Sequence, residues 1–316
     1  MQAREAGLAI ALVATALALT LASPFFLTVG NMLTVGKNAS EIGILALGMT
    51  IVLVTANVDL SVGAIYAAGG ITASIVLVAT GSPFLAIAAA IFVGAGIGSV
   101  NGALTGFLGL NSFMVTLATL NIVRGLALWA TGGGTVTLSG HDLSEGQLAP
   151  IEFLADRVVG GINMEFIFFL TLVVVLGWML RTTRLGFNLY AVGGNPYAAR
   201  NVGISVPLIV LAAFAISGAL AAFTGVLALS FVGTMNPLTG AGLEFDVFAA
   251  SVIGGSSLSG GRGSMVGTML GALFLSVARN GFILLGISAF AQTIAIGAII
   301  IIAIGIDRWF TLRQAR

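Results

Sequence analysis

The sequence contains no cysteine, one histidine and few charged residues among its 316 positions. Without cysteine, the chain can form no disulfide, no thiolate metal site and no cysteine nucleophile. The histidine, His141, stands in a polar stretch, which favours an ordinary solvated residue over a metal ligand or a general base. Charged residues make up 7% of the chain, whereas a soluble domain carries about a quarter. This scarcity of charge predicts a chain embedded in a bilayer. The sequence also lacks a recognisable pair of catalytic residues, which disfavours an enzyme.

Hydrophobic residues make up 58% of the chain and form long runs between charged breaks. A helix needs about 20 mostly apolar residues to cross the hydrocarbon core, and continuous rather than alternating runs exclude a barrel. We therefore predict an all-α polytopic membrane protein, one transmembrane domain over residues 1–316, with about ten transmembrane helices. The second and eighth spans are short and rich in Gly, Ser or charge, so the count ranges from about eight to eleven. The predicted spans are 8–27, 42–56, 60–80, 83–107, 113–131, 164–180, 207–232, 245–258, 265–285 and 289–306.

The arginines predict the orientation, because Lys and Arg are retained on the cytoplasmic side near the ends of spans. The longest break, 132–163, then faces the periplasm. Its charged residues are mostly acidic, which agrees with the orientation that the arginines predict. Both termini are expected in the cytoplasm, with the first helix retained because its apolar run outlasts a usual signal core. The basic residues follow this topology and form no nucleic-acid patch. With the N-terminus inside, the cytoplasmic arginines are Arg4, Arg181, Arg184, Arg200, Arg262, Arg308, Arg313 and Arg316.

Two nucleotide-binding patterns occur but fail on spacing. In GNMLTVGKN at 30–38, five residues separate the glycines, and Asn38 replaces the Ser or Thr that holds Mg²⁺ in a phosphate-binding P-loop. In GAGIGS at 94–99, Ser99 stands in place of the third glycine of a dinucleotide fingerprint, and no acidic residue follows at the required distance. The chain is therefore expected to bind no cofactor itself.

Glycine repeats every four residues in the fourth span, which predicts a groove for close helix packing. Residues at this spacing share one face of a helix, and small side chains there let a neighbouring helix approach. The same spacing recurs in the ninth span. The predicted packing residues are Gly94, Gly98, Gly102 and Gly106, then Gly267 and Gly271.

Several polar residues fall at membrane depth, where a charge is costly unless it faces protein or water. Asn121 and Arg124 share one face of the fifth span, and Ser276, Arg279 and Asn280 share one face of the ninth. Two interpretations stay open for them: pairing with a carboxylate such as Asp59 or Asp246 on another helix, or lining a polar solute path.

Two segments, 58–70 and 245–263, predict interrupted helices, since each places an Asp before small residues and Gly pairs. Broken backbone at membrane depth is tolerated only where it lines a cavity or is buried in protein. Short Gly-broken segments in two halves of a chain point towards a transport site.

Four blocks make the chain similar to the permease subunits of bacterial ABC sugar importers, the ribose, xylose and galactose branch. They are VDLSVGA at 58–64, FMVTLATLNIVRGLALWATGG at 113–133, TRLGFNLYAVGGNPYAARNVGI at 183–204 and AASVIGGSSLSGGRGSMVGTMLGALFL at 249–275. The chain departs from the family at Ala56 and Asn57, where a Gly pair is usual, and at Pro196 and Tyr197, where acidic residues are common.

The resemblance implies a fold similar to the cobalamin-importer (type II) class, in the bacterial inner membrane. It also implies a second permease subunit, a periplasmic sugar-binding protein, and cytoplasmic ATPase subunits that hold ATP and Mg. The sugar, and whether the dimer is homo- or heteromeric, stay open. The coupling loop to the ATPase would be 181–207.

Within the coupling loop, Asn195 can cap a helix that begins at Pro196 and stops near Gly203. Ala199 is expected on the contact face of this helix. The predicted coupling residues are Arg184, Gly193, Gly194, Asn195, Ala198, Ala199, Arg200 and Gly203.

The function expected is sugar import by alternating access. Sugars need hydrogen-bonding groups rather than charge, so the candidate path residues are Asn57, Asp59, Ser61, Asn121, Asn236 and Gln292, with Arg124, Asp246, Arg279 and Asn280 as intramembrane polar or pairing residues. The alternative is a secondary transporter coupled to protons or Na⁺ through Asp59 and Asp246.

The orientation can be tested with single cysteines, because the chain has no native thiol. A membrane-impermeant maleimide should label Ser144→Cys in intact spheroplasts and should label Asn201→Cys only after lysis. The reverse pattern would invert the predicted topology.

Overall fold

Eight helices in the described part of the chain are long and apolar enough to cross a membrane. The computed structural model describes residues 2–141, 143–156, 161–288, 290–295, 297–298, 301 and 305. The long helices are α1 (Gln2–Ala22), α2 (Val29–Val54), α3 (Val62–Thr80), α4 (Pro83–Gly106), α5 (Ser112–Thr131), α7 (Met164–Thr182), α10 (Val206–Val232) and α12 (Met265–Leu284). The shorter elements are α6 (Glu145–Ala155), α8 (Arg184–Gly194), α9 (Pro196–Asn201), α11 (Leu243–Ile253) and the antiparallel strands β1 (Val136–Thr137) and β2 (Thr234–Met235).

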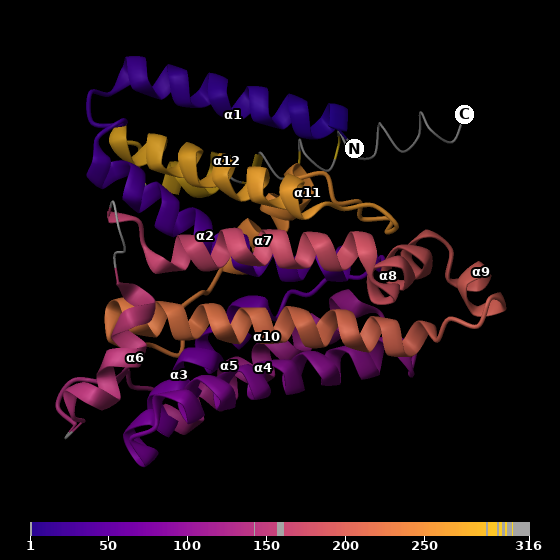
Figure 1. Cartoon of the computed structure of the whole chain (residues 1–316), viewed down its shortest axis with the longest axis horizontal. Coiled ribbons are helices and arrows are strands. Elements are labelled where there is room, and N and C mark those ends of the chain that lie inside the picture. The colour runs from indigo at the N-terminus through magenta and orange to yellow at the C-terminus, as the bar shows by residue number, and fades with distance from the viewer. Residues whose placement is uncertain are drawn as a thin grey trace.

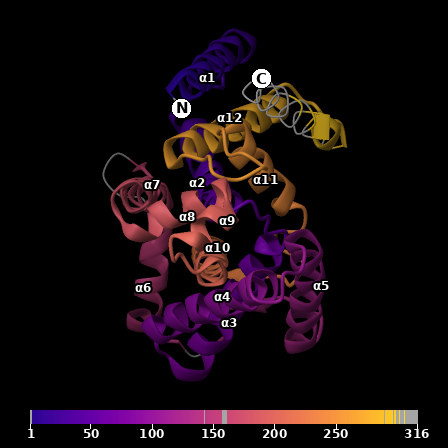
Figure 2. The same ribbon diagram turned by 90° about the vertical axis from the view of Figure 1, so that its right-hand side faces the viewer.

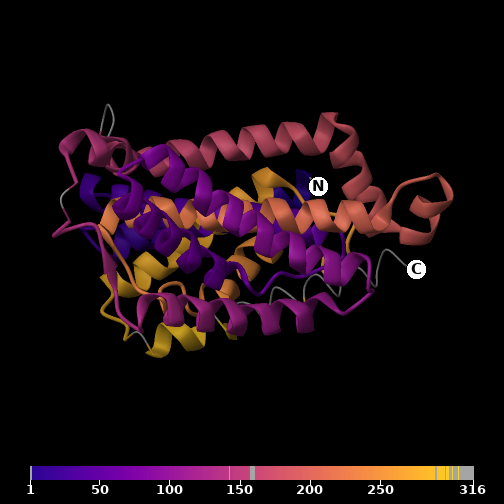
Figure 3. The same ribbon diagram turned by 90° about the horizontal axis from the view of Figure 1, so that it is seen from below.

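The two ends of the helix bundle carry different segments (Figure 1). Helices α8 and α9 project from one end, and the N-terminal end of α1 points the same way. There the Ser264 hydroxyl donates a 2.6 Å hydrogen bond to Glu5. Helix α6 lies at the opposite end. Helices α5 and α7 lie on opposite sides of the bundle, with α10 and α4 between them (Figures 2 and 3).

Three predicted spans differ from the structure. The second begins at Val29 rather than residue 42, because polar residues in the first half of α2 are paired within the protein instead of ending the helix. The eighth is wrong, since α11 has only 11 residues and a non-helical loop, 254–264, follows it. The first ends at Ala22, two residues before Pro24. The tenth span, 289–306, lies largely outside the described residues.

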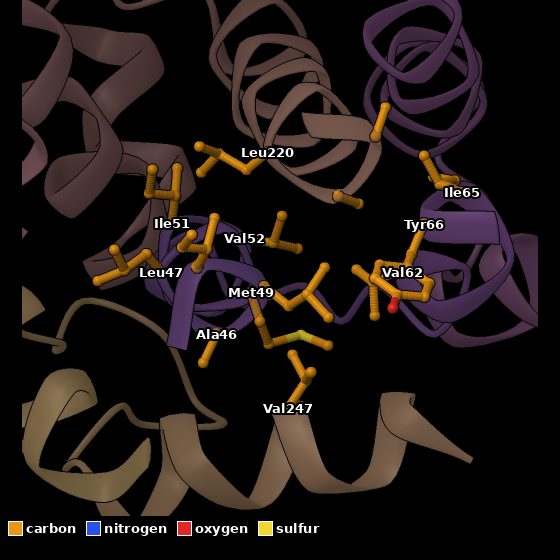
Figure 4. Packing of buried hydrophobic residues seen from close by; sticks show 14 of the residues in the cluster. Ala46, Leu47, Met49, Ile51, Val52, Val62, Ile65, Tyr66, Leu220 and Val247 are labelled. Atoms are coloured by element: carbon orange, nitrogen blue, oxygen red, sulfur yellow. The ribbon is translucent and has the colours of Figure 1, made fainter. Parts of the chain in front are cut away.

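Helix α2 forms the centre of the bundle, and 83% of the residues in its apolar 18-residue stretch are buried. Its side chains interdigitate with those of three neighbours, α3, α10 and α11 (Figure 4). Leu220 of α10, Val62 of α3 and Val247 of α11 point towards it from three directions. Because lipid is as apolar as leucine, this contact is held by close packing rather than by escape from water.

The glycine groove of α4 lies against α10. A Cβ atom at Gly94 or Gly98 would collide with the carbonyl oxygen of Gly218 or Phe214. At Gly102 it would lie 2.5 Å from the Cα of Leu211, and at Gly106 2.9 Å from the carbonyl oxygen of Pro207. The two backbones are therefore in direct contact along four turns.

The second pair of glycines serves a different contact. Cβ atoms at Gly267 and Gly271 of α12 would collide with the carbonyl oxygens of Gly254 and Ala250. Helix α12 therefore packs on α11 and on the start of the 254–264 loop, which keeps the short α11 inside the protein.

An alanine at Gly98 would press its Cβ atom against the Phe214 carbonyl oxygen of α10 and overpack the groove. Overpacking of this kind costs about 1–3 kcal/mol, so Gly98→Ala should lower the thermal stability of the purified chain. Gly96, on the same helix with no atom within 4 Å, is the matched control. Gly96→Ala should be neutral or stabilising by up to about 1 kcal/mol, since alanine favours helix. Equal melting temperatures for the two variants would refute the contact.

Candidate solute path and coupling segment

Asp59 is the centre of a buried polar network in the break between α2 and α3. Its carboxylate accepts hydrogen bonds from the Ser61 amide (3.0 Å), the Ser61 hydroxyl (2.6 Å) and the Ser217 hydroxyl of α10 (3.0 Å). Asn101 of α4 donates to Ser61 at 2.9 Å, and Thr119 of α5 donates to Asn101 at 2.6 Å. One carboxylate thus connects the 55–61 break to three helices.

This network changes the interpretation of two predicted path residues. Asp59 and Ser61 expose no surface at all, and their polar atoms are bonded within the protein. A solute in this conformation reaches neither of them. They fix the break between α2 and α3, and any part in the path would require the break to open.

The other four predicted path residues do not gather in one place. Asn57 bonds to Thr55 in its own turn, and Asn121 is exposed and bonds to Leu117 one turn earlier on α5. Asn236 follows β2 and donates to Thr135, whereas Gln292 donates to the Ile287 carbonyl. Their assignment to the path stays a prediction.

Arg124 of α5 supports a second stretch of broken backbone, the segment 236–242 between β2 and α11. Its guanidinium donates two hydrogen bonds of 2.6 Å, to the carbonyl oxygens of Pro237 and Thr239. Carbonyls that leave helical geometry at membrane depth need a donor, because no water is available in hydrocarbon. Arg124 therefore pairs with backbone and not with Asp59 or Asp246.

Arg279 and Asn280 of α12 each find a partner on another helix. One guanidinium nitrogen of Arg279 donates to both carboxylate oxygens of Asp246 on α11, at 2.8 and 2.9 Å. Asn280 and Asn31 of α2 exchange amide hydrogen bonds of 2.7 and 3.0 Å. Of the two interpretations left open by the sequence, Arg279 thus shows pairing with a carboxylate on another helix, Asp246. Asn31 was not expected as a partner of Asn280.

A charged cluster in the first half of α2 was missed by the sequence reasoning. Lys37 lies 3.4 Å from Glu41 and 4.4 Å from the centre of the Phe231 ring. The Tyr66 hydroxyl of α3 donates to Glu41 at 2.5 Å. The four-residue spacing of Lys37 and Glu41 was the available signal, because residues so spaced face each other on a helix.

The coupling segment consists of α8 and α9. Thr183 caps α8, and the Asn195 side chain accepts a hydrogen bond from the Ala198 amide at 3.0 Å and caps α9, which begins at Pro196. Gly203, with a φ of +85°, ends the turn after α9. The local sequence thus forms a short helix that projects from the bundle (Figure 1).

Ala199 does not lie on the contact face, which corrects the expectation from the sequence. Its side chain is 3% exposed and packs inside the hydrophobic core. On α9 and the turn after it, the large apolar side chains that are exposed are Tyr197 and Val202, at 77% and 75%. The free surface of α9 and the turn after it is therefore built on Tyr197 and Val202, and a charge at Ala199 would disturb the fold of the segment itself.

The coupling segment contacts the end of α2, just before the 55–61 break, and the 254–264 loop after α11. A Cβ at Gly193 would collide with the carbonyl oxygen of Val54, the last residue of α2, and would lie 2.7 Å from the Gly261 amide. Gly261 itself donates to Val54 at 2.9 Å, and the Tyr190 hydroxyl donates to the Gly263 carbonyl at 2.8 Å. Burial raises the pKa of Tyr190, which keeps this hydroxyl protonated as a donor.

The backbone is strained at Ala56, where the 55–61 break meets the 254–264 loop. Ala56 has a φ of +62°, a left-handed conformation that costs an alanine roughly 1–2 kcal/mol and glycine little. It lies next to Gly260 of the 254–264 loop. The resemblance described from the sequence implies glycine at this position, so the departure at Ala56 coincides with a backbone outlier.

The architecture is that of a polytopic helical membrane protein with buried polar breaks and a short helical element projecting from one end, as in a membrane transporter. The model of the family described as branched-chain amino acid transport system / permease component matches residues 31–304. The chain belongs to this permease family.

Curated relatives give closer comparisons. The chain is 35% identical over 286 residues to ribose import permease protein RbsC of Escherichia coli K12, which covers 90% of this chain and 88% of the relative. It is 33% identical to D-allose transport system permease protein AlsC of the same organism, over 92% and 86% of the two chains. It is 35% identical to L-arabinose ABC transporter permease protein AraH of Azospirillum brasilense, over 92% and 84%. The resemblance to ABC sugar importer permeases is confirmed.

Arg124 gives a direct test of the broken segment. Replacing it by Met removes two charge-assisted hydrogen bonds and should lower the free energy of unfolding by on the order of 3 kcal/mol. Asn121→Ala, on the same helix, removes only a bond to its own backbone and should have little effect. Thermal unfolding in detergent compares the two, and equal stability would show that Arg124 is dispensable to segment 236–242.

Proposed function

We propose that the chain is the transmembrane subunit of an ATP-driven importer, which carries a sugar or related polyol delivered by a periplasmic binding protein. The observation that carries the proposal is the coupling segment, whose exposed Tyr197 and Val202 stand at one end of a chain related to sugar permeases. The relatives are named for ribose, allose and arabinose, so an aldose is the substrate class proposed.

Energy is proposed to come from a separate ATPase that holds ATP and Mg. Residues 30–38, which resemble a P-loop in composition, lie inside α2. Residues 94–99, which resemble a dinucleotide fingerprint, lie inside α4. From Met32 onwards the amides of α2 are bonded to carbonyls four residues earlier, as are those inside α4, so they cannot cradle phosphates as a loop does. This geometry supports an energy source outside the chain.

The contacts suggest how movement would spread. An ATPase that displaces α8 and α9 would press Gly193 on the end of α2 and pull on the 254–264 loop through Tyr190. The end of α2 leads into the 55–61 break, and the 254–264 loop is itself broken backbone that follows α11. Packed helices shift between discrete arrangements, so rocking at these two joints would open one side of the path and close the other.

Further partners follow from the same proposal. A second permease subunit would complete the path, the α6 end would receive the binding protein, and both termini would lie in the cytoplasm of a bacterium with this chain in its inner membrane. The proton- or Na⁺-coupled alternative would use Asp59 and Asp246 as carriers, and in this structure neither carboxylate is free. Asp59 is bonded to three donors and Asp246 to Arg279.

The coupling surface can be tested by adding charge. Tyr197→Asp and Val202→Asp should leave the chain inserted and folded while abolishing co-purification of the ATPase and sugar uptake, because a buried unpaired charge destabilises an interface. Thr182 is exposed at the last position of α7, next to α8, and Thr182→Asp should retain both ATPase co-purification and sugar uptake. Blue-native gels and uptake assays measure the outcome.

Two results would contradict the proposal. Normal ATPase association by both aspartate variants would remove α9 from the interface. Solute uptake by the purified chain alone in liposomes, driven by a proton or Na⁺ gradient, would establish the coupled carrier instead.

A further inference from the structure

A polar cavity of about 290 Å³ lies between the first half of α2 and the second half of α12. Its wall includes Asn38 and Glu41 of α2, Tyr66 of α3, Thr239 of the 236–242 segment, and Ser276 and Arg279 of α12. The volume is near the lower end of the roughly 300–1,000 Å³ typical of small-molecule sites. These halves of α2 and α12 lie towards the α6 end of the bundle, opposite α8 and α9.

A second cavity of about 480 Å³ adjoins the first, with Ala241, Leu243 and Arg279 in both walls. Asp246 lines the second cavity, so the Arg279–Asp246 ion pair stands where the two meet. Arg279 exposes 38% of its side chain, which places this junction at the surface of the single chain rather than deep in its core.

The hydrogen-bonding groups in the wall are not all committed. The Ser276 side chain is 2% exposed, and its hydroxyl has no partner among the described residues. A buried hydroxyl without a partner costs free energy, so its presence beside a cavity indicates that a visiting group satisfies it. Arg279 uses one of its nitrogens for Asp246, which leaves other N–H groups for a ligand.

The charges in the wall are balanced. Glu41 faces Lys37 at 3.4 Å and accepts from Tyr66, and Arg279 is held by both oxygens of Asp246. A charged solute would have to break one of these pairs and leave a partly buried charge unpaired, which is costly. A neutral solute with many hydroxyl groups can bond to the same side chains without disturbing either pair.

We infer that this cavity is where the permease contacts its solute as it enters from the α6 end, and that it selects an uncharged polyhydroxyl compound over a phosphorylated or carboxylated sugar. The inference rests on the proposed function, and it adds the residues and the charge requirement. Ser276 and Arg279 supply donors, whereas Lys37 and Asp246 keep the wall neutral.

The test uses the absence of native cysteine. Ser276→Cys, in the importer purified with its ATPase and binding protein and placed in liposomes, should react with the small neutral reagent methyl methanethiosulfonate. Ser251→Cys is the matched control, since Ser251 is fully buried on α11 and lines neither cavity. Asn38→Cys probes the same cavity from α2, which protects the test against a folding defect at Ser276.

The probes are D-ribose, D-allose, L-arabinose and ribose 5-phosphate. The sugar that the importer carries should slow labelling of Ser276→Cys and Asn38→Cys by about threefold or more, because a bound ligand covers most of such a site. Ribose 5-phosphate should not slow it. Uptake by the parent chain is measured separately and reports on the proposed function alone.

Two outcomes would overturn the inference while the proposed function stands. One is labelling of both cavity cysteines no faster than Ser251→Cys in liposomes whose parent importer takes up sugar. The other is labelling that the transported sugar leaves unchanged, or that ribose 5-phosphate slows equally.

Discussion

Every backbone carbonyl and amide at membrane depth must be bonded inside the protein, and the rest of this structure depends on how that requirement is met where helices break. At 55–61 the Asp59 carboxylate receives the Ser61 amide, and at 236–242 Arg124 supplies donors to Pro237 and Thr239. At 254–264 the Gly261 amide bonds to the end of α2. Asp59 and Arg124 are therefore first of all partners of broken backbone.

These breaks also connect the two ends of the bundle. The coupling segment touches the last residue of α2 through Gly193, while the cavity beside Ser276 and Arg279 lies at the other half of the same helix and of α12. From Ala39 to Val54 helix α2 is almost entirely buried and closely packed, so a displacement at its C-terminal end cannot be absorbed along this stretch. A central helix joined to breaks at both ends suits a subunit that passes movement from a partner to a solute.

Sequence reasoning was most accurate where a feature depends on neighbours in the chain. The long apolar runs locate six of the spanning helices to within two residues at each end. It failed where a distant partner decides: the second span was predicted to begin at residue 42, after Lys37 and Glu41, yet α2 already begins at Val29. The helix includes both charges because Tyr66 donates a hydrogen bond to Glu41 and Lys37 lies over the Phe231 ring. It placed Ala199 on a contact face, although α9 turns that side inwards.

The sequence by itself determined the membrane-spanning class, the family blocks, the four-residue glycine spacing and the cap of α9, because each follows from composition or from residues one turn apart. Only the tertiary structure decided that α4 uses its glycines against α10, that Arg124 bonds to carbonyls and Arg279 to Asp246, and that a neutral polar cavity lies between α2 and α12. Those outcomes join residues far apart in sequence, and in a bilayer the choice among partners is made by which unpaired polar group each helix brings within reach.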